Sequence, residues 1–481
     1  MIGIFHNRFS YQWASASECL AVLIGKHVAL AWDKFVCYLE HCQSVFHMFH
    51  DKPGGSAELS DQSSDLAECS FVTPVSDSTP CATVLSSLLQ TLQKIPSVAE
   101  SRSRQIIPLF LKFLGYNNND LASVGLFNPV TCKGKEWKGI LKEWLNLLKL
   151  MRNSKAFYKN QFVKDVLQTR LIDEDDVHIQ TSVLDCLLTW KDDFLLQYEQ
   201  HLRNLISLNH LREELITWNL SRESAVIEEG HRANLVPFVI LLLMPKVRKL
   251  KMLASRKHTS INQRKVVLRF IAQLDVGELT LFFVSLLKPL HILPEGVDSA
   301  AIFFWNLCKS SVDEFQTSNI LKHFTMEKIM ALSWKQRTGF LHVVEDILGV
   351  FDESRTRPFL DLLMGCVVRL LGSCTASLDA VKDASSVVED NTSDNQKLHE
   401  NNNAILNQVA RSTAVKQFKD MRSLCLRIVS LVLNKYDDHD FGDEFWELFF
   451  KSVKPLIDSF KQEGSSSGET KFIVVMLFGD E

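Results

Sequence analysis

The feature that most constrains the fold of this chain is a long succession of amphipathic helical patterns. Most run for about ten to twenty residues, and short turns containing Asn, Asp, Gly or Pro separate them. Gly and Pro are scarce, at 19 and 12 of 481 residues, while 46% of the residues are hydrophobic. No single helix pair of this kind buries its own apolar face, but stacked pairs do. The pattern therefore predicts an all-α chain built as an α-solenoid.

Five predicted helix pairs carry this interpretation. The clearest joins residues 171–190 to a second helix at 193–205, with one apolar face formed by Leu171, Val177, Leu184, Leu187 and Leu188. Its first helix resembles that of a HEAT repeat, although His178 stands where the repeat commonly has Arg. The other predicted pairs are 11–25 with 28–50, 81–94 with 101–114, 133–150 with 155–169, and 335–349 with 355–371.

Three segments interrupt the helices and divide the chain. Residues 51–80 carry six acids against one Lys, and residues 373–403 carry six acids against two Lys. Both are predicted to be disordered acidic insertions. Residues 462–481 are expected to form an irregular tail. The remaining parts are predicted to be HEAT-like helices at 1–50, a HEAT-like solenoid at 81–372 with a basic segment at 232–269, and further HEAT-like helices at 404–461.

Local positive charge distinguishes residues 232–274 from the rest of a chain whose net charge is −4. This stretch has ten cations and no Asp or Glu. Residues 245–258 are expected to form a helix end or a connecting loop, and residues 260–274 a helix. On that helix the residues predicted to face the core are Val267, Leu268, Ile271 and Leu274, and those predicted to face outward are Arg264, Lys265 and Arg269.

Three interpretations of the basic segment stay open: contact with RNA or a ribonucleoprotein, a nuclear-localisation element, and a solvated helix face. Cations at this spacing can track phosphates, whereas almost no aromatic residue is available to stack on bases, so contact with the RNA backbone is favoured. The candidate contact residues are Lys246, Arg248, Lys249, Lys251, Arg256, Lys257, Arg264 and Lys265.

The sequence contains no catalytic motif of the common nucleotide-binding, hydrolase or metalloprotease types. The acids Asp173–Asp176 point in different directions around a helix, which favours a helix N-terminal turn over a metal site. Two Cys/His pairs, Cys37 with His41 and His47 with His50, lie more than two turns apart, and no further pair is available to complete a zinc shell. We therefore expect no enzyme activity, no metal or other cofactor, and no small-molecule substrate.

The cysteines and the apolar runs indicate the kind of environment. Eleven scattered cysteines, no CxxC pair and no secretory leader at the N-terminus predict reduced thiols in a cytosolic or nuclear protein. The apolar run at 235–245 has about half the length that a bilayer-spanning helix needs. No membrane partner is expected.

Residues 235–290 resemble the signature block of the Down-Regulated-In-Metastasis family, a very large HEAT-repeat component of the small-subunit processome. In that family an apolar helix ending in Pro is followed by a basic tract, a helix of the form R-x-x-V-L-R-F-[IL]-A, an acidic turn and a second apolar helix ending in Pro. These elements lie here at Val239–Pro245, Lys246–Lys257, Arg264–Ala272, Asp275–Glu278 and Leu279–Pro289.

The resemblance extends over most of residues 1–460 and implies a non-enzymatic scaffold in the nucleus and nucleolus. Its implied partners are pre-rRNA, small nucleolar ribonucleoprotein and other processome proteins, and its implied role is to support pre-rRNA processing and small-subunit biogenesis. The chain is much shorter than full-length members, so it is expected to correspond to an internal part of one. The alternatives are a HEAT-repeat nuclear transport receptor and a generic protein-interaction scaffold.

Overall fold

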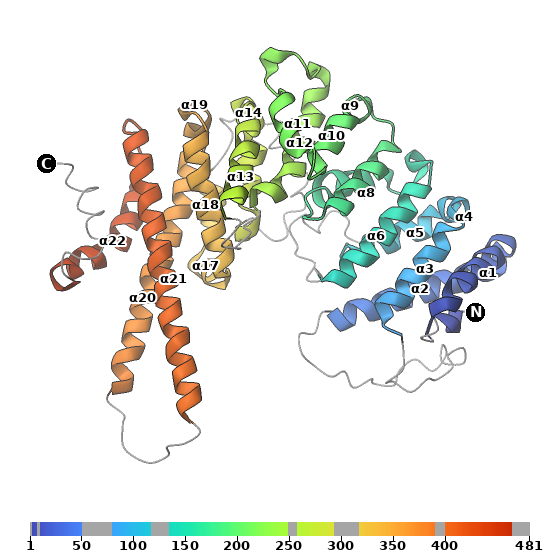
Figure 1. The fold of residues 1–481 in the computed structure, drawn as a ribbon, viewed down its shortest axis with the longest axis horizontal. Helices are drawn as coiled ribbons and strands as arrows, with labels where there is room; N and C mark the ends of the chain where they lie inside the picture. Colours follow the sequence, from blue (N-terminus) through green and yellow to red (C-terminus); the bar gives the residue numbers. More distant parts are fainter. Residues whose placement is uncertain are drawn as a thin grey trace. The chain divides into compact units, whose positions relative to one another are not determined.

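The computed structural model describes residues 2–6, 10–50, 79–116, 134–248, 257–292, 317–389 and 400–463. All regular elements in these ranges are helices or helical turns, with no strand among them, so the prediction of an all-α chain is confirmed (Figure 1). The predicted insertion at 51–80 lies almost wholly outside the described residues, and so does the predicted tail from 464 onward.

Two compact units make up the described chain. The first takes in the described residues of Met1–Glu214 together with Asn234–Leu242, and the second takes in those of Leu215–Ala233, Leu243–Pro294 and Trp305–Glu481. Two helices contribute residues to both units, namely α11 (Leu211–Thr217) and α12 (Glu229–Arg248).

The first unit is a stack of antiparallel helices. Its elements are η1 (Ile2–His6), η2 (Ser10–Gln12), α1 (Trp13–Lys26), α2 (Val28–His50), α3 (Cys81–Gln93), α4 (Pro96–Ser101), α5 (Ser103–Phe113), α6 (Lys135–Leu150), η5 (Ser154–Ala156), α7 (Asn160–Val166), η6 (Leu167–Leu171), α8 (Val177–Leu188), α9 (Asp193–Leu196) and α10 (Glu199–Ile206). Helix α1 packs on α2 and α3, α3 packs on α6, and α6 packs on α8, as neighbouring repeats of a solenoid do (Figure 1).

Helix α6 shows why these sequences stack. Its buried residues are Trp137, Ile140, Leu141, Trp144, Leu145, Leu147 and Leu148, which recur at spacings of three and four and form one broad apolar face. Some polar groups between the helices are paired: Ser17 Oγ lies 3.0 Å from Thr91 Oγ1. The amide nitrogen of Gln180 donates to the carbonyl oxygens of Ile172 and Leu242 at 2.8 and 3.0 Å. Burial therefore leaves these polar groups satisfied.

The second unit repeats this arrangement with longer helices towards its end. Its elements are η7 (Arg222–Ser224), α13 (Lys257–Ile271), α14 (Val276–Leu286), η9 (Lys288–Leu290), α16 (Thr317–Lys322), α17 (Met326–Ala331), α18 (Trp334–Val350), α19 (Glu353–Thr356), η11 (Arg357–Phe359), α20 (Leu360–Glu389), α21 (Glu400–Lys435) and α22 (Asp443–Glu463). Helix α18 packs on both α13 and α21, and α20 packs on α21 and α22. Figure 1 shows α20 and α21 as a long antiparallel pair.

Helices are present in all five predicted pairs, although several bounds differ, and the largest difference in a start is at α8. Residue Leu171 ends a π-helical turn that continues α7, whereas α8 begins at Val177. Its buried residues are Ile179, Gln180, Val183, Leu184, Cys186 and Leu187. The face predicted through Leu171, Val177 and Leu188 is therefore wrong in part, because the apolar pattern was extended across a helix boundary.

Asp176 sets that boundary. Its Oδ1 accepts hydrogen bonds from the backbone N–H groups of His178 and Ile179 at 3.0 and 3.2 Å, the geometry of an N-cap. Its Oδ2 also lies 3.2 Å from Lys142 Nζ. Burial favours a higher pKa for this carboxyl group, but the hydrogen bonds and the ion pair outweigh burial, so the pKa of Asp176 is below its ordinary value. The acidic run is thus a helix N-terminus, as the sequence indicates.

The predicted disordered insertion at 373–403 is wrong where the structure describes it. Helix α20 continues to Glu389 and α21 begins at Glu400, which leaves only 390–399 outside the described residues. At the start of this segment small residues allow close helix packing. Thr375 Oγ1 donates to the carbonyl oxygen of Ser452 on α22 at 3.1 Å, and a Cβ added at Gly372 would lie 3.2 Å from Ser452 Oγ.

Among the described residues, one stretch is long and apolar enough to cross a membrane by length and composition alone. It spans Glu353–Ser377, and 78% of its most apolar window is buried inside the protein. This burial is what a core helix of a helical stack shows. The stretch includes the start of α20, which packs on α21 and α22.

Candidate nucleic-acid interface

The basic segment begins at a helix that is buried nearly all round. In α12 the residues from Leu235 to Met244 are mostly inaccessible to solvent, and Lys246 and Arg248 lie half-buried in its last turn. Cations in a last turn are favoured by the partial negative charge of the helix C-terminus. These two candidate contacts therefore lie at the edge of the core.

Arg232, the first cation of the basic segment, is buried in the core of the second unit. Its side chain is 3% exposed, and its guanidinium donates to both carboxylate oxygens of Glu278 at 2.8 Å and to the carbonyl oxygen of Leu220 at 3.0 and 3.1 Å. The hydrogen bonds and charge of Glu278 outweigh burial and raise the pKa of Arg232. This charge is neutralised within the second unit and adds little to a surface potential.

Four candidate contacts lie beyond what the structure describes. Lys249, Lys251 and Arg256 fall in 249–256, outside the described residues. Lys257 begins α13, but its side chain is not described. The proposed contacts at these four residues therefore remain predictions from the sequence.

The three described cations of helix α13 differ in their exposure to solvent. The sequence predicts that Arg264, Lys265 and Arg269 face outward, and for Arg264 this prediction is wrong. The Arg264 side chain is 6% exposed and Nε donates to Asp346 Oδ2 on α18 at 2.6 Å, with Nη2 also paired to that oxygen. The reason is helical geometry: Arg264 lies three, four and seven residues before buried core residues and shares their face.

The other two cations of α13 do face solvent. The Lys265 side chain is 44% exposed, and its Nζ lies 3.8 Å from Asp346 Oδ1. Arg269, four residues on, is also exposed and therefore lies on the same side of the helix. These two positive charges are available to a partner.

The neighbouring helices α18 and α21 add an exposed Arg and the carboxylate with which it pairs. Arg427 on α21 donates through Nε to Glu345 Oε1 on α18 at 2.8 Å, and His342 Nδ1 lies 3.5 Å from Glu345 Oε2. Because of the hydrogen bond from His342 and that from Arg427, the pKa of Glu345 is below its ordinary value despite partial burial. Glu345 precedes Asp346 in α18, and α18 packs on both α13 and α21.

We call Lys265, Arg269, His342 and Arg427 the basic face. Two of these side chains, Lys265 and Arg427, remain about half exposed while contacting a carboxylate. His342 and Arg427 could not be predicted from the sequence, because they come from helices far along the chain and no local motif relates them to the basic segment. Only the stacking of α18 between α13 and α21 brings them together.

The arrangement offers electrostatic contact. Among the described residues, no three His, Cys, Asp or Glu side chains come together in a way that could hold a metal ion. In the pairs considered for zinc, Cys37 and His41 are exposed on α2, and His47 is half-buried with its ring 5.7 Å from that of Phe113. Exposed cations on α13 and α21, the two helices that pack on α18, offer charge contacts to a phosphate backbone.

Comparison with known proteins adds an independent finding. A family model described as "U3 small nucleolar RNA-associated protein 20, N-terminal" matches residues 135–472, more than two thirds of the chain. A protein of Schizosaccharomyces pombe, "U3 small nucleolar RNA-associated protein 20", is 24% identical over 294 residues. The aligned region covers 61% of this chain and 10% of that protein, so the chain spans only a small part of its relative's length.

Proposed function

Because this chain belongs to the U3 small nucleolar RNA-associated protein 20 family, we propose that it is part of a non-enzymatic helical scaffold of the nucleolar small-subunit processome. In this proposal it contacts pre-rRNA, small nucleolar ribonucleoprotein and other processome proteins, and supports pre-rRNA processing in the nucleus. The family match across α6 to α22 is the observation that carries the proposal. This family match agrees with the resemblance of residues 235–290 to the Down-Regulated-In-Metastasis family.

The basic face is the surface that we assign to RNA. Its Lys and Arg side chains lie on α13 and α21, which both pack on α18, and a scaffold that holds a long RNA needs repeated backbone contacts of this kind. The half-buried Lys246 and Arg248 and the following Lys249, Lys251, Arg256 and Lys257 belong to the same proposal. In this proposal Arg264 does not contact RNA. Its buried pair with Asp346 holds α13 on α18 and so positions Lys265 and Arg269.

Gradient sedimentation tests the proposal at the level of the particle. The tagged chain would be expressed in cells, and nuclear extract would be fractionated on a sucrose gradient with and without ribonuclease. We expect the chain to co-migrate with unprocessed pre-rRNA in large particles and to leave these fractions after ribonuclease treatment. Migration as a small species that ribonuclease does not affect would contradict the proposal and would favour a transport-type or generic scaffold.

A further inference from the structure

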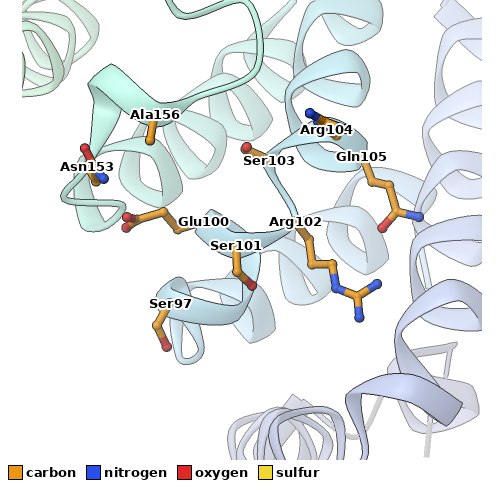
Figure 2. A pocket seen from close by; sticks show the side chains of 9 residues that line it. All are labelled: Ser97, Glu100, Ser101, Arg102, Ser103, Arg104, Gln105, Asn153 and Ala156. Atoms are coloured by element: carbon orange, nitrogen blue, oxygen red, sulfur yellow. The ribbon is translucent and has the colours of Figure 1, made fainter.

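A solvent-open pocket lies in the first unit between the α4–α5 turn and the η5 turn (Figure 2). Its volume is about 610 Å³, which is large enough for a phosphate group with an attached sugar. The polar groups that line it include Ser97, Ser101, Arg102, Ser103, Arg104 and Asn153. Among the lining residues Ala156 alone is apolar, and none is aromatic.

The local sequence explains how the pocket forms. Pro96 begins α4, Arg102 links it to α5, and the chain after α6 returns past them through Asn153 into η5. Glu100 holds the two turns together, because its Oε2 accepts a hydrogen bond from the backbone N–H of Arg152 at 3.0 Å. Figure 2 shows Glu100 directed towards Asn153, while Arg102 and Gln105 extend on the other side of the turn.

Ser103 offers an unpaired donor to the pocket. The residue is only 8% exposed, it lines the pocket, and its hydroxyl makes no hydrogen bond with any other described residue. Figure 2 shows this hydroxyl turned towards the Ala156 side of the pocket. The hydroxyl oxygen keeps its access to the pocket, so it is free to donate to a ligand there. The hydroxyl of the nearby Ser101 is already committed, since its Oγ donates to the carbonyl oxygen of Val98 at 2.8 Å.

The charge around the pocket selects an anion. Residues 97–105 and 151–156 carry four cations against one carboxylate, that of Glu100, and a second carboxylate, Asp33, accepts a hydrogen bond from the lining residue Gln105 at 3.2 Å. The pocket also lies at the N-terminus of the eleven-residue α5, which adds partial positive charge. Arg102 is held in place: its guanidinium lies 5.9 Å from the ring centroid of Trp32, and the Trp32 indole N–H donates to Gln105 Oε1 at 2.5 Å.

We propose that this pocket binds a phosphate group of an RNA backbone, with the Ser103 hydroxyl and the Arg104 guanidinium as donors. The absence of aromatic rings from its lining gives a base nothing to stack on, so recognition is of phosphate and sugar and is independent of sequence. The choice of RNA as the source of the phosphate rests on the proposed function. The pocket lies in the first unit, whereas the basic face lies in the second. The pocket would therefore give the chain a second contact with the RNA backbone.

Trp32 provides a native reporter for this site, because it contacts both Arg102 and Gln105. The purified full chain would be labelled with 5-fluorotryptophan, and the Trp32 resonance among nine tryptophans would be assigned from a Trp32→Phe variant. A short single-stranded RNA and, separately, inorganic phosphate would be titrated while the ¹⁹F spectrum is recorded. We expect RNA to shift the Trp32 resonance in a saturable way.

The variants decide whether the shift reports the pocket. Ser103→Ala and Arg104→Gln should each weaken the RNA concentration dependence of the shift by about 10-fold, the effect of one lost hydrogen bond to a charged group. Ser101→Ala is the matched control and should change it little, because its hydroxyl is already bonded to Val98. A shift with inorganic phosphate as well as RNA supports a phosphate site, and a shift with RNA alone supports one that needs the attached sugar.

Three results would overturn the inference: no Trp32 shift while RNA binds elsewhere on the chain, a shift with inorganic phosphate alone, or equal affinities for all variants. These failures are distinct from failure of the proposed function, which is judged by particle sedimentation. The purified Lys265→Gln/Arg269→Gln variant distinguishes RNA binding at the pocket from RNA binding at the basic face. It should retain the Trp32 shift while losing contacts on the basic face.

Discussion

Removing one partner of the Arg264–Asp346 pair should destabilise the second unit strongly, whereas replacing both partners should not. The two side chains are 6% and 10% exposed. A buried charge that loses its partner costs about 3–5 kcal/mol, while well-packed apolar replacements of both are often neutral or stabilising. Lys265 Nζ, 3.8 Å from Asp346, compensates in part. We therefore expect Arg264→Met to lower the free energy of unfolding by about 3 kcal/mol, the lower end of that range.

Urea denaturation followed by far-UV circular dichroism measures this effect. The wild type, Arg264→Met, Asp346→Leu and the double variant form a cycle, and the double variant should unfold close to the wild-type midpoint. A loss below about 1 kcal/mol for both single variants, the range of an exposed pair, would refute the reasoning. It would mean that the pair does not hold α13 on α18.

The same double variant separates stability from RNA contact. It should bind a short single-stranded RNA as the wild type does, because the Arg264 charge is buried. By contrast, Lys265→Gln/Arg269→Gln should reduce the slope of log affinity against log salt by about 1.4, at about 0.7 for each lost phosphate contact. Lys26→Gln/Lys34→Gln changes the net charge equally on the exposed surface of α1 and α2 and serves as control. Weaker RNA binding by a stable double variant would show that RNA contact needs the charge pair itself and not only the packing of α13 on α18.

Three further perturbations test other parts of the fold. Gly139→Ala should raise the free energy of unfolding by about 1 kcal/mol in thermal or urea unfolding, because the position is exposed within α6 and an added Cβ meets nothing within 4 Å; a loss of stability would contradict this. Asp176→Ala should cost about 1 kcal/mol at neutral pH through loss of the cap. Since the folded-state pKa of Asp176 is lowered, this difference should disappear as the pH falls through that pKa, and a difference that persists in acid would contradict the cap. Iodoacetamide at pH 8 should label the exposed Cys19 and Cys37 before Cys42, whose pKa burial raises to about 12, as peptide mass spectrometry would show; early labelling of Cys42 would refute its burial.

Helical periodicity in the sequence predicted the helix pairs because each apolar face repeats every three to four residues. The same periodicity would have placed Arg264 correctly, since it lies on the face of Leu268 and Ile271. The outward prediction gave its charge more weight than its position. A buried Arg needs a partner such as Asp346, and that residue comes from another helix that the sequence alone does not pair with α13.

Composition predicted too much disorder at 373–403. Ser, Thr and Asn favour linkers, but small side chains also let helices approach closely, as at Gly372 and Thr375 against α22. Distinguishing the two requires knowing what packs opposite. The same limit applies to Arg427 on the basic face and to the pocket around Ser103, because both depend on segments that are distant in sequence and brought together by stacking.

Ultraviolet crosslinking of the tagged chain to RNA in cells, with sequencing of the RNA and mass spectrometry of the crosslinked peptides, tests the proposed RNA scaffold at the level of single contacts. We expect the RNA to be pre-rRNA or small nucleolar RNA, and the crosslinked peptides to come from residues 246–269 and from the part of α21 around Arg427. Crosslinks confined to other regions, or the recovery of no such RNA from a folded chain, would refute the proposal.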